Sequence, residues 1–228
     1  MRYFGGKYRI ADSIVSVLNK YRKENQIFVE LFVGGANIMC KMTGERYAYD
    51  FHRELICLWK SLQKGYIPPV DIDRELYIDI KKNPDKYEPE LVAFVGFGCS
   101  FAGKYFGGYA SSLGRNYASN AKNSLLSKIK TLKDVKFECK DYREVDYEGA
   151  LIYLDPPYLN MTQPLGKFDT KEFWERVRYL SKKNTVIVSE YQAPEDFECI
   201  WEKNVNLDIR NKHNQKENRV EKLFKLKQ

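Results

Sequence analysis

The sequence predicts an α/β fold, a Rossmann-like sheet with helices on both faces and a small inserted region. Short apolar strands alternate with amphipathic helices along most of the chain. A strand, a glycine turn and a helix follow one another over residues 27–42, which is typical of a nucleotide-binding βα unit. An apolar strand at 150–154 runs into Asp155-Pro156-Pro157-Tyr158, where open α/β sheets bind their ligands.

The other elements follow from the same periodicities. In the first unit the strand covers residues 27–32 and the helix 36–42. The remaining expected elements are helices at 10–22, 52–65, 71–95 (divided near Pro84), 119–133 and 170–183, and strands at 46–50, 135–139 and 185–189. Residues 96–117 are rich in Gly, Ser and Tyr and show no period. We therefore expect one domain made of residues 1–65 and 134–228, with the helices and loops of 66–133 inserted into it.

Composition excludes several classes of protein. Of the 228 residues 43% are hydrophobic and 30% charged, which excludes collagen-like and wholly disordered chains. The absence of a long apolar run and of a signal-peptide pattern predicts a cytoplasmic protein without membrane contact. A net charge of +7 favours a polyanionic partner. The five cysteines and the two histidines are widely spaced, so neither a disulfide framework nor a metal site is expected.

The strongest chemical pattern is Asp155-Pro156-Pro157-Tyr158. Two prolines fix the backbone and remove two N–H donors, so the turn presents a carboxylate and carbonyl oxygens beside an aromatic ring. Asp155 and the Pro156 carbonyl can accept both N–H bonds of an adenine amino group, and Tyr158 can stack on the base. Such acceptors concentrate electron density on the nitrogen. The motif thus predicts methyl transfer to an amino group.

A second pattern is Glu30-Leu31-Phe32-Val33-Gly34-Gly35-Ala36, whose glycines permit close approach of a ligand. Asp50 ends the next strand, where an acid can hold two ribose hydroxyls. The turn matches neither the dinucleotide fingerprint nor a phosphate-binding P-loop. Asp141-Tyr142, after the 135–139 strand, can clasp an adenine. Taken alone, however, Asp141-Tyr142 is more typical of an ordinary strand end, and Gly5-Gly6-Lys7 is more typical of a flexible, basic N-terminal segment.

The insertion carries positive charge among aromatic residues. Residues 100–133 contain no acid. Their basic residues are Lys104, Arg115, Lys122, Lys128, Lys130 and Lys133, and Tyr105, Phe106, Tyr109 and Tyr117 interleave with the first of them. Such a pattern suits phosphate contact and base stacking, although a solvated helix face explains residues 122–133 equally well.

In this order, the motifs resemble those of the Dam-type DNA adenine-N6 methyltransferases, particularly the short phage and prophage forms. The segments that carry the resemblance are Tyr3-Phe4-Gly5-Gly6-Lys7, Glu30 to Ala36, Asp50, Gly98 to Tyr109, Asp155 to Tyr158, and Val188-Ser189-Glu190-Tyr191. They span nearly the whole chain. Tyr3, Leu31 and Ala36 stand where the family frequently has Trp, Pro and Gly.

The resemblance implies an S-adenosylmethionine-dependent methyltransferase sheet that acts on double-stranded DNA without an obligate protein partner, in the cytoplasm of a bacterial or phage-infected cell. It places Tyr3, Lys7, Asp50 and Asp155 at the methyl-donor site, lined by Glu30, Phe32, Gly34, Asp141 and Tyr142. It makes residues 66–133 the target-recognition region, with DNA contacts expected from Lys104, Tyr105, Tyr109, Arg115, Asn116, Tyr117 and Lys122.

Other functions share parts of this pattern. The tetrapeptide also permits methylation of cytosine N4, of RNA adenine or of a protein glutamine amide, although Asp rather than Asn at 155 disfavours the last. A DNA-binding module without catalysis is a further alternative, which the intact Asp155 and Tyr158 disfavour.

Overall fold

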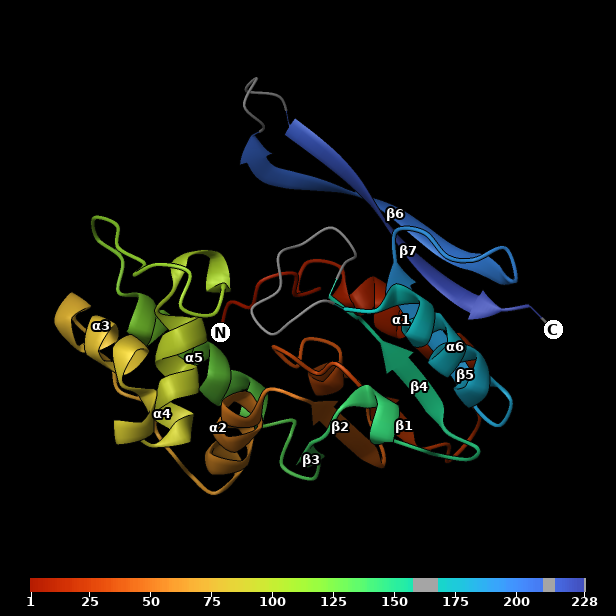
Figure 1. Ribbon diagram of the computed structural model, residues 1–228, viewed down its shortest axis with the longest axis horizontal. Coiled ribbons are helices and arrows are strands. Elements are labelled where there is room, and N and C mark those ends of the chain that lie inside the picture. The colour runs from red at the N-terminus through yellow and green to blue at the C-terminus, as the bar shows by residue number, and fades with distance from the viewer. Residues whose placement is uncertain (158–167, 211–215, 228) are drawn as a thin grey trace.

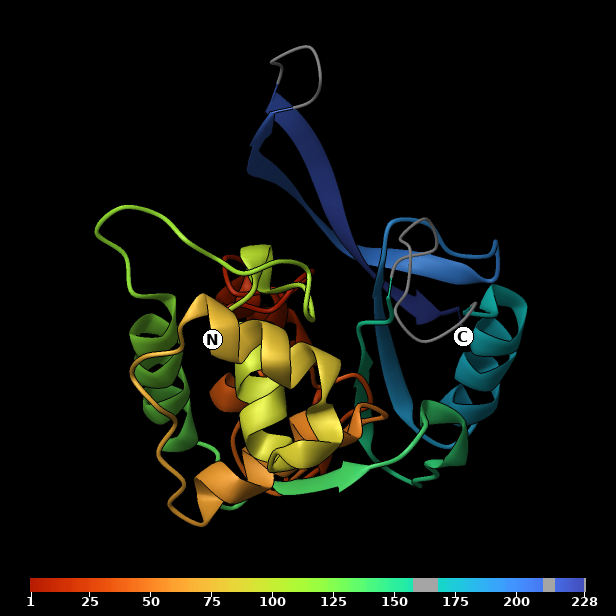
Figure 2. The same ribbon diagram turned by 60° about the vertical axis from the view of Figure 1, so that its left-hand side comes forward.

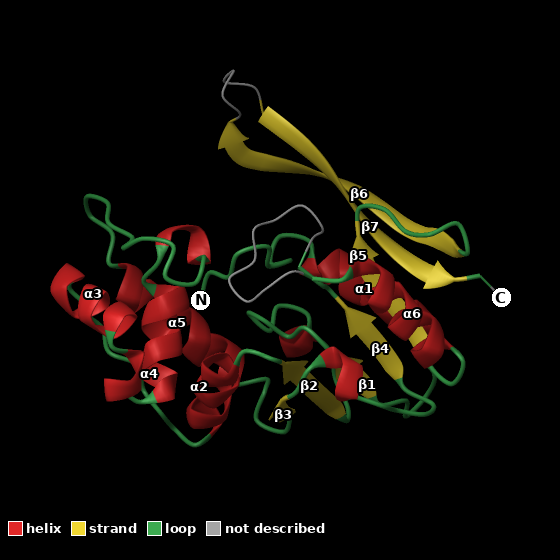
Figure 3. Ribbon diagram, in the orientation of Figure 1, coloured by secondary structure: helices red, strands yellow, loops and turns green. Residues whose placement is uncertain are grey.

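A computed structural model describes residues 1–157, 168–210 and 216–227, with side chains for 1–157, 168–205 and 220–227. These residues form a seven-stranded sheet in the order β3-β2-β1-β4-β5-β7-β6 (Figures 1 and 3). The strands are β1 (Phe28–Glu30), β2 (Arg46–Asp50), β3 (Lys136–Cys139), β4 (Leu151–Leu154), β5 (Thr185–Glu190), β6 (Phe197–Arg210) and β7 (Lys216–Leu226). The first five pair in parallel, and β7 pairs antiparallel with both β5 and β6.

Helices connect these strands. The α-helices are α1 (Ala11–Tyr21), α2 (Arg53–Gln63), α3 (Arg74–Lys82), α4 (Pro89–Ala93), α5 (Tyr117–Ile129) and α6 (Thr170–Ser181). The short helical turns are η1 (Met39–Lys41), η2 (Pro84–Lys86), η3 (Phe94–Gly98), η4 (Phe101–Gly103) and η5 (Tyr142–Glu144). None of the helices in the described part of the chain is long and apolar enough to span a membrane.

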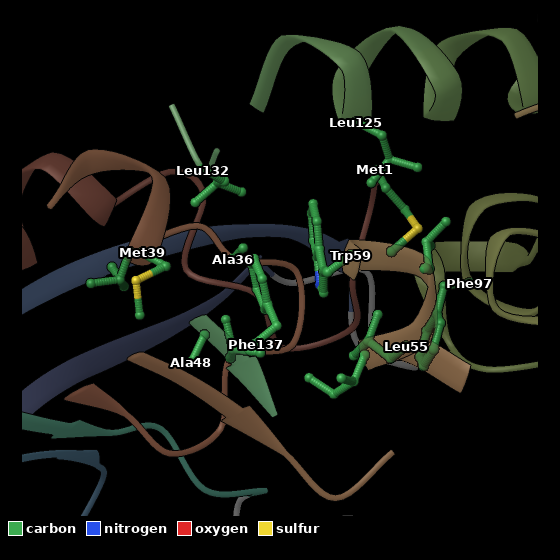
Figure 4. Close-up of a cluster of buried hydrophobic side chains, with 14 of the residues drawn as sticks. Met1, Ala36, Met39, Ala48, Leu55, Trp59, Phe97, Leu125, Leu132 and Phe137 are labelled. Atoms are coloured by element: carbon green, nitrogen blue, oxygen red, sulfur yellow. The ribbon is translucent and has the colours of Figure 1, made fainter. Parts of the chain in front are cut away.

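Two hydrophobic cores lie on opposite faces of the sheet because strand side chains alternate. In β4, Leu151 and Tyr153 join the core covered by α1 and α2, whereas Ile152 and Leu154 join the core covered by α6. In the first core Trp59 stacks on Phe137 with ring centroids 5.8 Å apart (Figure 4). The predicted α/β sheet with helices on both faces is confirmed.

The segment expected as an insertion packs on the rest of the chain. Figure 1 shows α3, α4 and α5 grouped beside α2, at the β3 end of the sheet. Tyr77, Phe94 and Leu125 from this segment belong to the same core as Trp59. The segment therefore shares its hydrophobic core with the sheet.

One expected helix is wrong. Residues 36–42 contain only the short turn η1, because the backbone takes left-handed angles at Gly34 (φ 44°) and Ala36 (φ 51°), which an α-helix cannot accommodate. A positive φ is unfavourable for Ala36, which has a Cβ. The family that the sequence resembles frequently has Gly at this position, and Gly adopts this conformation without that cost. The helix expected over 71–95 divides into α3 and α4 on either side of Pro84 as predicted.

The topology determines which ends of the strands can form a site. Strand order reverses at β1, which pairs with β2 on one side and β4 on the other. A crevice for ligands forms outside the carboxyl ends at such a point. Glu190, the last residue of β5, pairs with Lys222, so the part of β7 that precedes Lys222 extends past this same edge. Figure 2 shows the β6–β7 hairpin projecting beyond the body of the molecule.

Candidate active site

A cavity of about 210 Å³ lies at the carboxyl ends of β1, β2 and β4. Seven of the residues predicted from sequence for the donor site line it, namely Tyr3, Lys7, Glu30, Phe32, Gly34, Asp50 and Asp155. Pro156 and two residues expected to contact DNA, Lys104 and Tyr105, also line it. Thus one cavity joins residues more than 150 positions apart in the chain.

Asp155 is held by an ion pair with Lys7. The Lys7 Nζ lies 2.7 Å from Asp155 Oδ1 and 3.7 Å from Glu221 Oε2, and the Lys7 side chain is only 4% exposed. Burial raises the pKa of Asp155, and the Lys7 ammonium opposes this shift. Burial alone would lower the pKa of Lys7, but Asp155 and Glu221 outweigh it and the net shift is upward. The lysine therefore stays charged between two carboxylates.

Asp50 fixes the glycine turn. Its Oδ2 accepts the Gly34 N–H at 3.0 Å and its Oδ1 accepts the His52 N–H at 3.0 Å. The Trp59 indole N–H donates to the Gly34 carbonyl at 3.1 Å, which anchors the turn to α2. Each carboxylate oxygen of Asp50 can still accept a further hydrogen bond. Asp50 can therefore hold a ligand hydroxyl while it holds the turn.

The glycines of the turn make room for Tyr3. A Cβ added at Gly34 would lie 2.7 Å from Tyr3 Cε1, and one added at Gly35 would lie 2.8 Å from Tyr3 Cβ. Tyr3 also stacks on Phe97, with centroids 5.0 Å apart. The N-terminal segment is thus seated against the glycine turn, which brings Lys7 to Asp155.

Glu30 has one carboxylate oxygen that bonds the Met39 backbone and one that has no donor among the described residues. It is 3% exposed, and its Oε2 has no hydrogen-bond partner among the described residues. Burial raises the pKa of this carboxyl well above its usual range, and the nearby Asp155 adds to the shift. A buried acceptor that lines a cavity is satisfied by a donor on a ligand, and a cationic donor would restore its charge.

Asp141 and Tyr142 lie beside the cavity without lining it. Asp141 accepts the Arg143 backbone N–H at 2.9 Å at the start of η5 and also binds the Arg143 guanidinium. The Tyr142 ring lies 5.2 Å from the ring of Phe32, which does line the cavity. Tyr142 therefore reaches the cavity through Phe32, whereas the contacts of Asp141 are to Arg143. Tyr158 lies outside the described residues.

The residues expected to contact DNA divide into two groups. Lys104 and Tyr105 line the cavity already described, and Tyr105 packs against His52 and Phe106. Tyr109, Arg115, Asn116 and Tyr117 line a second cavity of about 320 Å³, together with Asp71 and Asp73. Lys122 lies further along α5.

Two acids, Asp71 and Asp73, line the second cavity, although no acid lies within residues 100–133. The Asn116 amide donates to Asp71 Oδ1 at 2.7 Å, and its Oδ1 caps α5 by accepting the Ser119 N–H at 2.8 Å. The Tyr109 hydroxyl donates to the Ile72 carbonyl at 2.8 Å. Asn116 and Tyr109 therefore hold the insertion together, and Arg115 is the exposed cation of this group.

Sequence reasoning missed several residues of the site. Lys128 of α5 donates to the Gly35 carbonyl and, at 2.6 Å, to Asn37 Oδ1, yet its place in a basic helix suggested only a solvated face. Phe51 follows Asp50 directly, lines the cavity and is 49% exposed. Glu221 lies in a C-terminal segment of alternating charges, and that pattern does not predict which charge faces the site. Of these residues only Phe51 could have been predicted, from its position next to Asp50.

Comparisons with known proteins point to one family. The model of the D12 class N6 adenine-specific DNA methyltransferase family matches residues 3–90 and 101–195, which include the glycine turn, Asp50 and Asp155. The modification methylase StsI of Streptococcus sanguinis is 24% identical over 193 residues, which are 71% of this chain and 29% of that protein. The chain thus spans less than a third of that relative's length.

Solved structures with similar folds include two methyltransferases. The rRNA methyltransferase aviRa of Streptomyces viridochromogenes superposes with a TM-score of 0.46 at 8% identity, covering 96% of this chain and 84% of that one. The magnesium protoporphyrin IX methyltransferase of Synechocystis PCC 6803, with bound SAM, gives a TM-score of 0.43 at 9% identity, covering 96% and 77%.

Proposed function

The chain belongs to the D12 class N6 adenine-specific DNA methyltransferases, and from this premise we propose that it transfers a methyl group from S-adenosylmethionine to the N6 amino group of adenine in double-stranded DNA. The observation that carries the proposal is the buried Lys7–Asp155 pair, which faces one cavity together with Glu30 and Asp50. Residues 66–133 form the target-recognition region in this proposal. A DNA substrate of this kind is found in the cytoplasm of a bacterial or phage-infected cell.

The cavity suits S-adenosylmethionine in its chemistry. The partnerless Glu30 oxygen fits a cationic amino group, and the free acceptor capacity of Asp50 fits ribose hydroxyls. Phe51 offers an exposed ring to a planar base, and Tyr3, Phe32 and Gly34 complete the lining. Tyr142 contributes through Phe32, and Asp141, directly before it in the chain, is assigned to the donor site with it. When bound, the donor supplies a methyl group activated by a sulfonium.

The same cavity presents acceptors to the target amino group. The Asp155 carboxylate and the Pro156 carbonyl accept its two N–H bonds and thereby raise the electron density on N6. Lys7 holds Asp155 in place at 2.7 Å and opposes the rise in its pKa that burial causes. Because these atoms lie at a strand end below the surface, the adenine must leave the duplex to reach them. Tyr158 is assigned to stacking on that base.

Positioning accounts for much of the expected acceleration. Groups held in reactive geometry save about 7–11 kcal/mol of the barrier relative to free reactants. The buried ion pair and the Gly34–Asp50 bond fix both sides of the cavity before any ligand binds.

The test is analysis of nucleosides after methyl transfer. Unmethylated genomic DNA is incubated with the chain and isotopically labelled S-adenosylmethionine, digested and examined by mass spectrometry. We expect labelled N6-methyladenine from the wild type and about 1% of that amount or less from Asp155→Ala. Asp12→Ala is the matched control, since Asp12 forms an exposed ion pair with Lys41 at the same 2.7 Å.

Other products contradict the proposal. Labelled N4-methylcytosine would move the activity to the cytosine amino group, and label in RNA but not in DNA would move it to RNA adenine. DNA binding without any transfer of label would make the chain a binding module.

A further inference from the structure

Two carboxyl groups beside the active site have no part in the methyl transfer described above. Glu190 ends β5 and is 4% exposed, and the Glu221 side chain of β7 is 13% exposed. The Glu221 Oε2 lies 3.7 Å from the Lys7 Nζ, which also pairs with Asp155 Oδ1 at 2.7 Å. Asp155, Lys7 and Glu221 therefore form a row of charged groups that begins in the cavity and ends at a partly exposed carboxylate.

The sheet and the N-terminal segment bring this row together. Glu190 pairs with Lys222, so Glu221 lies just past the end of β5. Side chains two residues apart share one face of a strand, and Leu223 belongs to the core covered by α1 and α2. Glu221 consequently faces the side of the sheet on which Lys7 lies, in the segment that leads into α1.

Methyl transfer to an amino group releases one proton, which the active site has to remove. As the S–CH3 bond breaks and the N–CH3 bond forms, the positive charge passes from sulfur to N6, and N6 is neutralised when one N–H bond breaks. In the proposed function Asp155 accepts that N–H, so the proton passes to an Asp155 oxygen. Burial, which raises the pKa of Asp155, favours this protonated form. Asp155 must then lose the proton before it can accept the amino group of the next adenine.

We propose that Lys7 and Glu221 carry this proton from Asp155 to solvent. The inference rests on the proposed function, because it starts from an N6 proton bound to Asp155. Lys7 takes the proton from Asp155 as it gives one of its own N–H protons to Glu221, so the lysine remains an ammonium and Asp155 becomes a carboxylate again. Glu221 is then neutral, and its partly exposed carboxyl group releases the proton to water.

The distances and charges of the row are consistent with this route. The 3.7 Å between the Lys7 Nζ and the Glu221 Oε2 exceeds a hydrogen bond by about 0.5–1 Å, which a small movement of the Glu221 side chain or one bridging water covers. Burial raises the pKa of Glu190 to about 7, and the charges of Asp155 and Glu221 add to this rise. Neighbouring carboxylates favour uptake of a proton by one of them, so a proton that leaves Asp155 is held nearby.

Glu221 is the exit of the route and Glu190 is not. The Glu190 Oε1 accepts the Tyr191 N–H at 2.8 Å, and the residue is buried. Glu221 combines contact with the Lys7 ammonium and access to water. Because it acts on Asp155 through Lys7, Glu221 is a positioning residue for the proton and leaves methyl transfer itself to Asp155.

The test separates the first methyl transfer from the return of the enzyme to its starting state. The variants are Glu221→Gln, which cannot take up a proton, and Glu221→Asp, which can. Glu202→Gln is the control, because it removes an exposed carboxylate of the same hairpin that lies 4.0 Å from Lys222. Rapid quenching measures the first turnover, and excess duplex and S-adenosylmethionine give the steady state, each in H2O and in D2O. Calorimetry measures donor binding, and thermal unfolding checks the fold.

We expect Glu221→Gln to complete its first turnover at the wild-type rate and then to slow about tenfold, less than the roughly 10²–10⁴-fold typical of a group that exchanges a proton with the substrate itself. D2O should lower the steady-state rate of Glu221→Gln more than that of the wild type, because a proton transfer limits the variant. Glu221→Asp should recover part of the steady-state rate, since its shorter side chain still carries a carboxylate. Glu202→Gln should match the wild type in both phases, and donor binding should be the same in all variants.

Two results overturn the proton route while the proposed function stands. An equal loss in the first turnover and in the steady state of Glu221→Gln would show that Glu221 only holds Lys7 in place. An unchanged steady-state rate in Glu221→Gln would show that the proton leaves Asp155 by another path. A wild-type chain that transfers no methyl group to DNA in the first turnover overturns the proposed function, and this inference falls with it.

Discussion

The Lys7–Asp155 pair and the cations of the insertion are charged groups in opposite environments. Lys7 and Asp155 are 4% and 17% exposed and lie 2.7 Å apart, at a strand end that the sheet topology fixes. Lys104 and Arg115 are exposed on a loop without regular structure. The contrast separates what the fold itself dictates from what a loop adds to it.

The two environments predict effects of different size. Removing one partner of a buried pair leaves an uncompensated charge, whereas an exposed charge is screened by water and salt. The buried region should therefore respond to single substitutions by losing function or stability. The exposed region should respond by graded, salt-dependent changes in DNA binding.

The largest expected effect is that of Asp155→Ala. The variant loses the acceptor for the target amino group, so we expect turnover to fall about 10²–10³-fold, equivalent to about 3–4 kcal/mol. The fold should survive, since Glu221 still faces Lys7 at 3.7 Å. Steady-state methylation assays and thermal unfolding measure the two properties. Asp12→Ala, which breaks an equally short but exposed pair, should change neither. Retention of more than about 3% of turnover would remove Asp155 from catalysis.

Glu190 should make stability depend on pH. It is 4% exposed at the end of β5, and burial raises its pKa from 4.5 to about 7. A carboxyl whose pKa is raised on folding stabilises the protein fully below its unfolded pKa, and this contribution is lost as pH rises through the folded value. Between pH 5 and 8 the loss amounts to roughly 3 kcal/mol.

Denaturant unfolding of Glu190→Gln at several pH values measures this contribution. The difference between the wild type and Glu190→Gln in free energy of unfolding should change over that pH range by roughly the same 3 kcal/mol. Glu202→Gln, at an exposed glutamate of β6, is the control and should follow the wild type. Parallel curves for the wild type and Glu190→Gln would show that Glu190 does not titrate in this range.

The same contrast explains which parts of the site the sequence could predict. Asp50 and Asp155 each end or follow a strand, and parallel strands bring their carboxyl ends to one edge, so local pattern sufficed. Glu221 reaches that edge because Glu190 pairs with Lys222, a register between segments more than 30 residues apart. The contact of Lys128 with the Gly35 carbonyl depends on how α5 packs against the glycine turn. Hydrophobic periodicity also predicted a helix at 36–42, but periodicity contains no information about the left-handed backbone angle at Ala36.

Asp50→Ala should weaken binding of the methyl donor more than it slows methyl transfer from the bound donor. If Asp50 holds ribose hydroxyls, the loss of hydrogen bonds to a charged group costs about 1.5–3 kcal/mol in donor binding. Calorimetric titration of S-adenosylmethionine measures this directly. Asp50→Asn is the companion variant, because its amide oxygen still accepts one of the Gly34 and His52 N–H bonds. Unchanged donor affinity in both variants would contradict the assignment.

The smallest and most informative effects are expected at Arg115 and Lys104. Arg115 lines the cavity that also holds Asp71, and a guanidinium can bind guanine with two hydrogen bonds. We expect Arg115→Ala to cost roughly 1–3 kcal/mol on the methylated site and to relax specificity at one base pair. Lys104→Ala should instead weaken all duplexes alike and lower the slope of log K against log salt concentration by about 1, the mark of one lost phosphate contact.

Binding at several salt concentrations, on matched and mismatched duplexes, separates the two roles. Lys23→Ala is the control, because Lys23 is exposed just before β1, at the opposite edge of the sheet from the cavity. If Arg115→Ala changes only the salt slope, the Arg115 side chain contacts phosphate in the wild type. The sequence specificity of the insertion must then reside in other residues. If both variants bind every duplex as the wild type does while donor binding is normal, residues 100–118 do not recognise DNA. DNA recognition would then have to come from an exposed segment outside residues 100–118, and that segment would be the one to compare with the site at the strand ends.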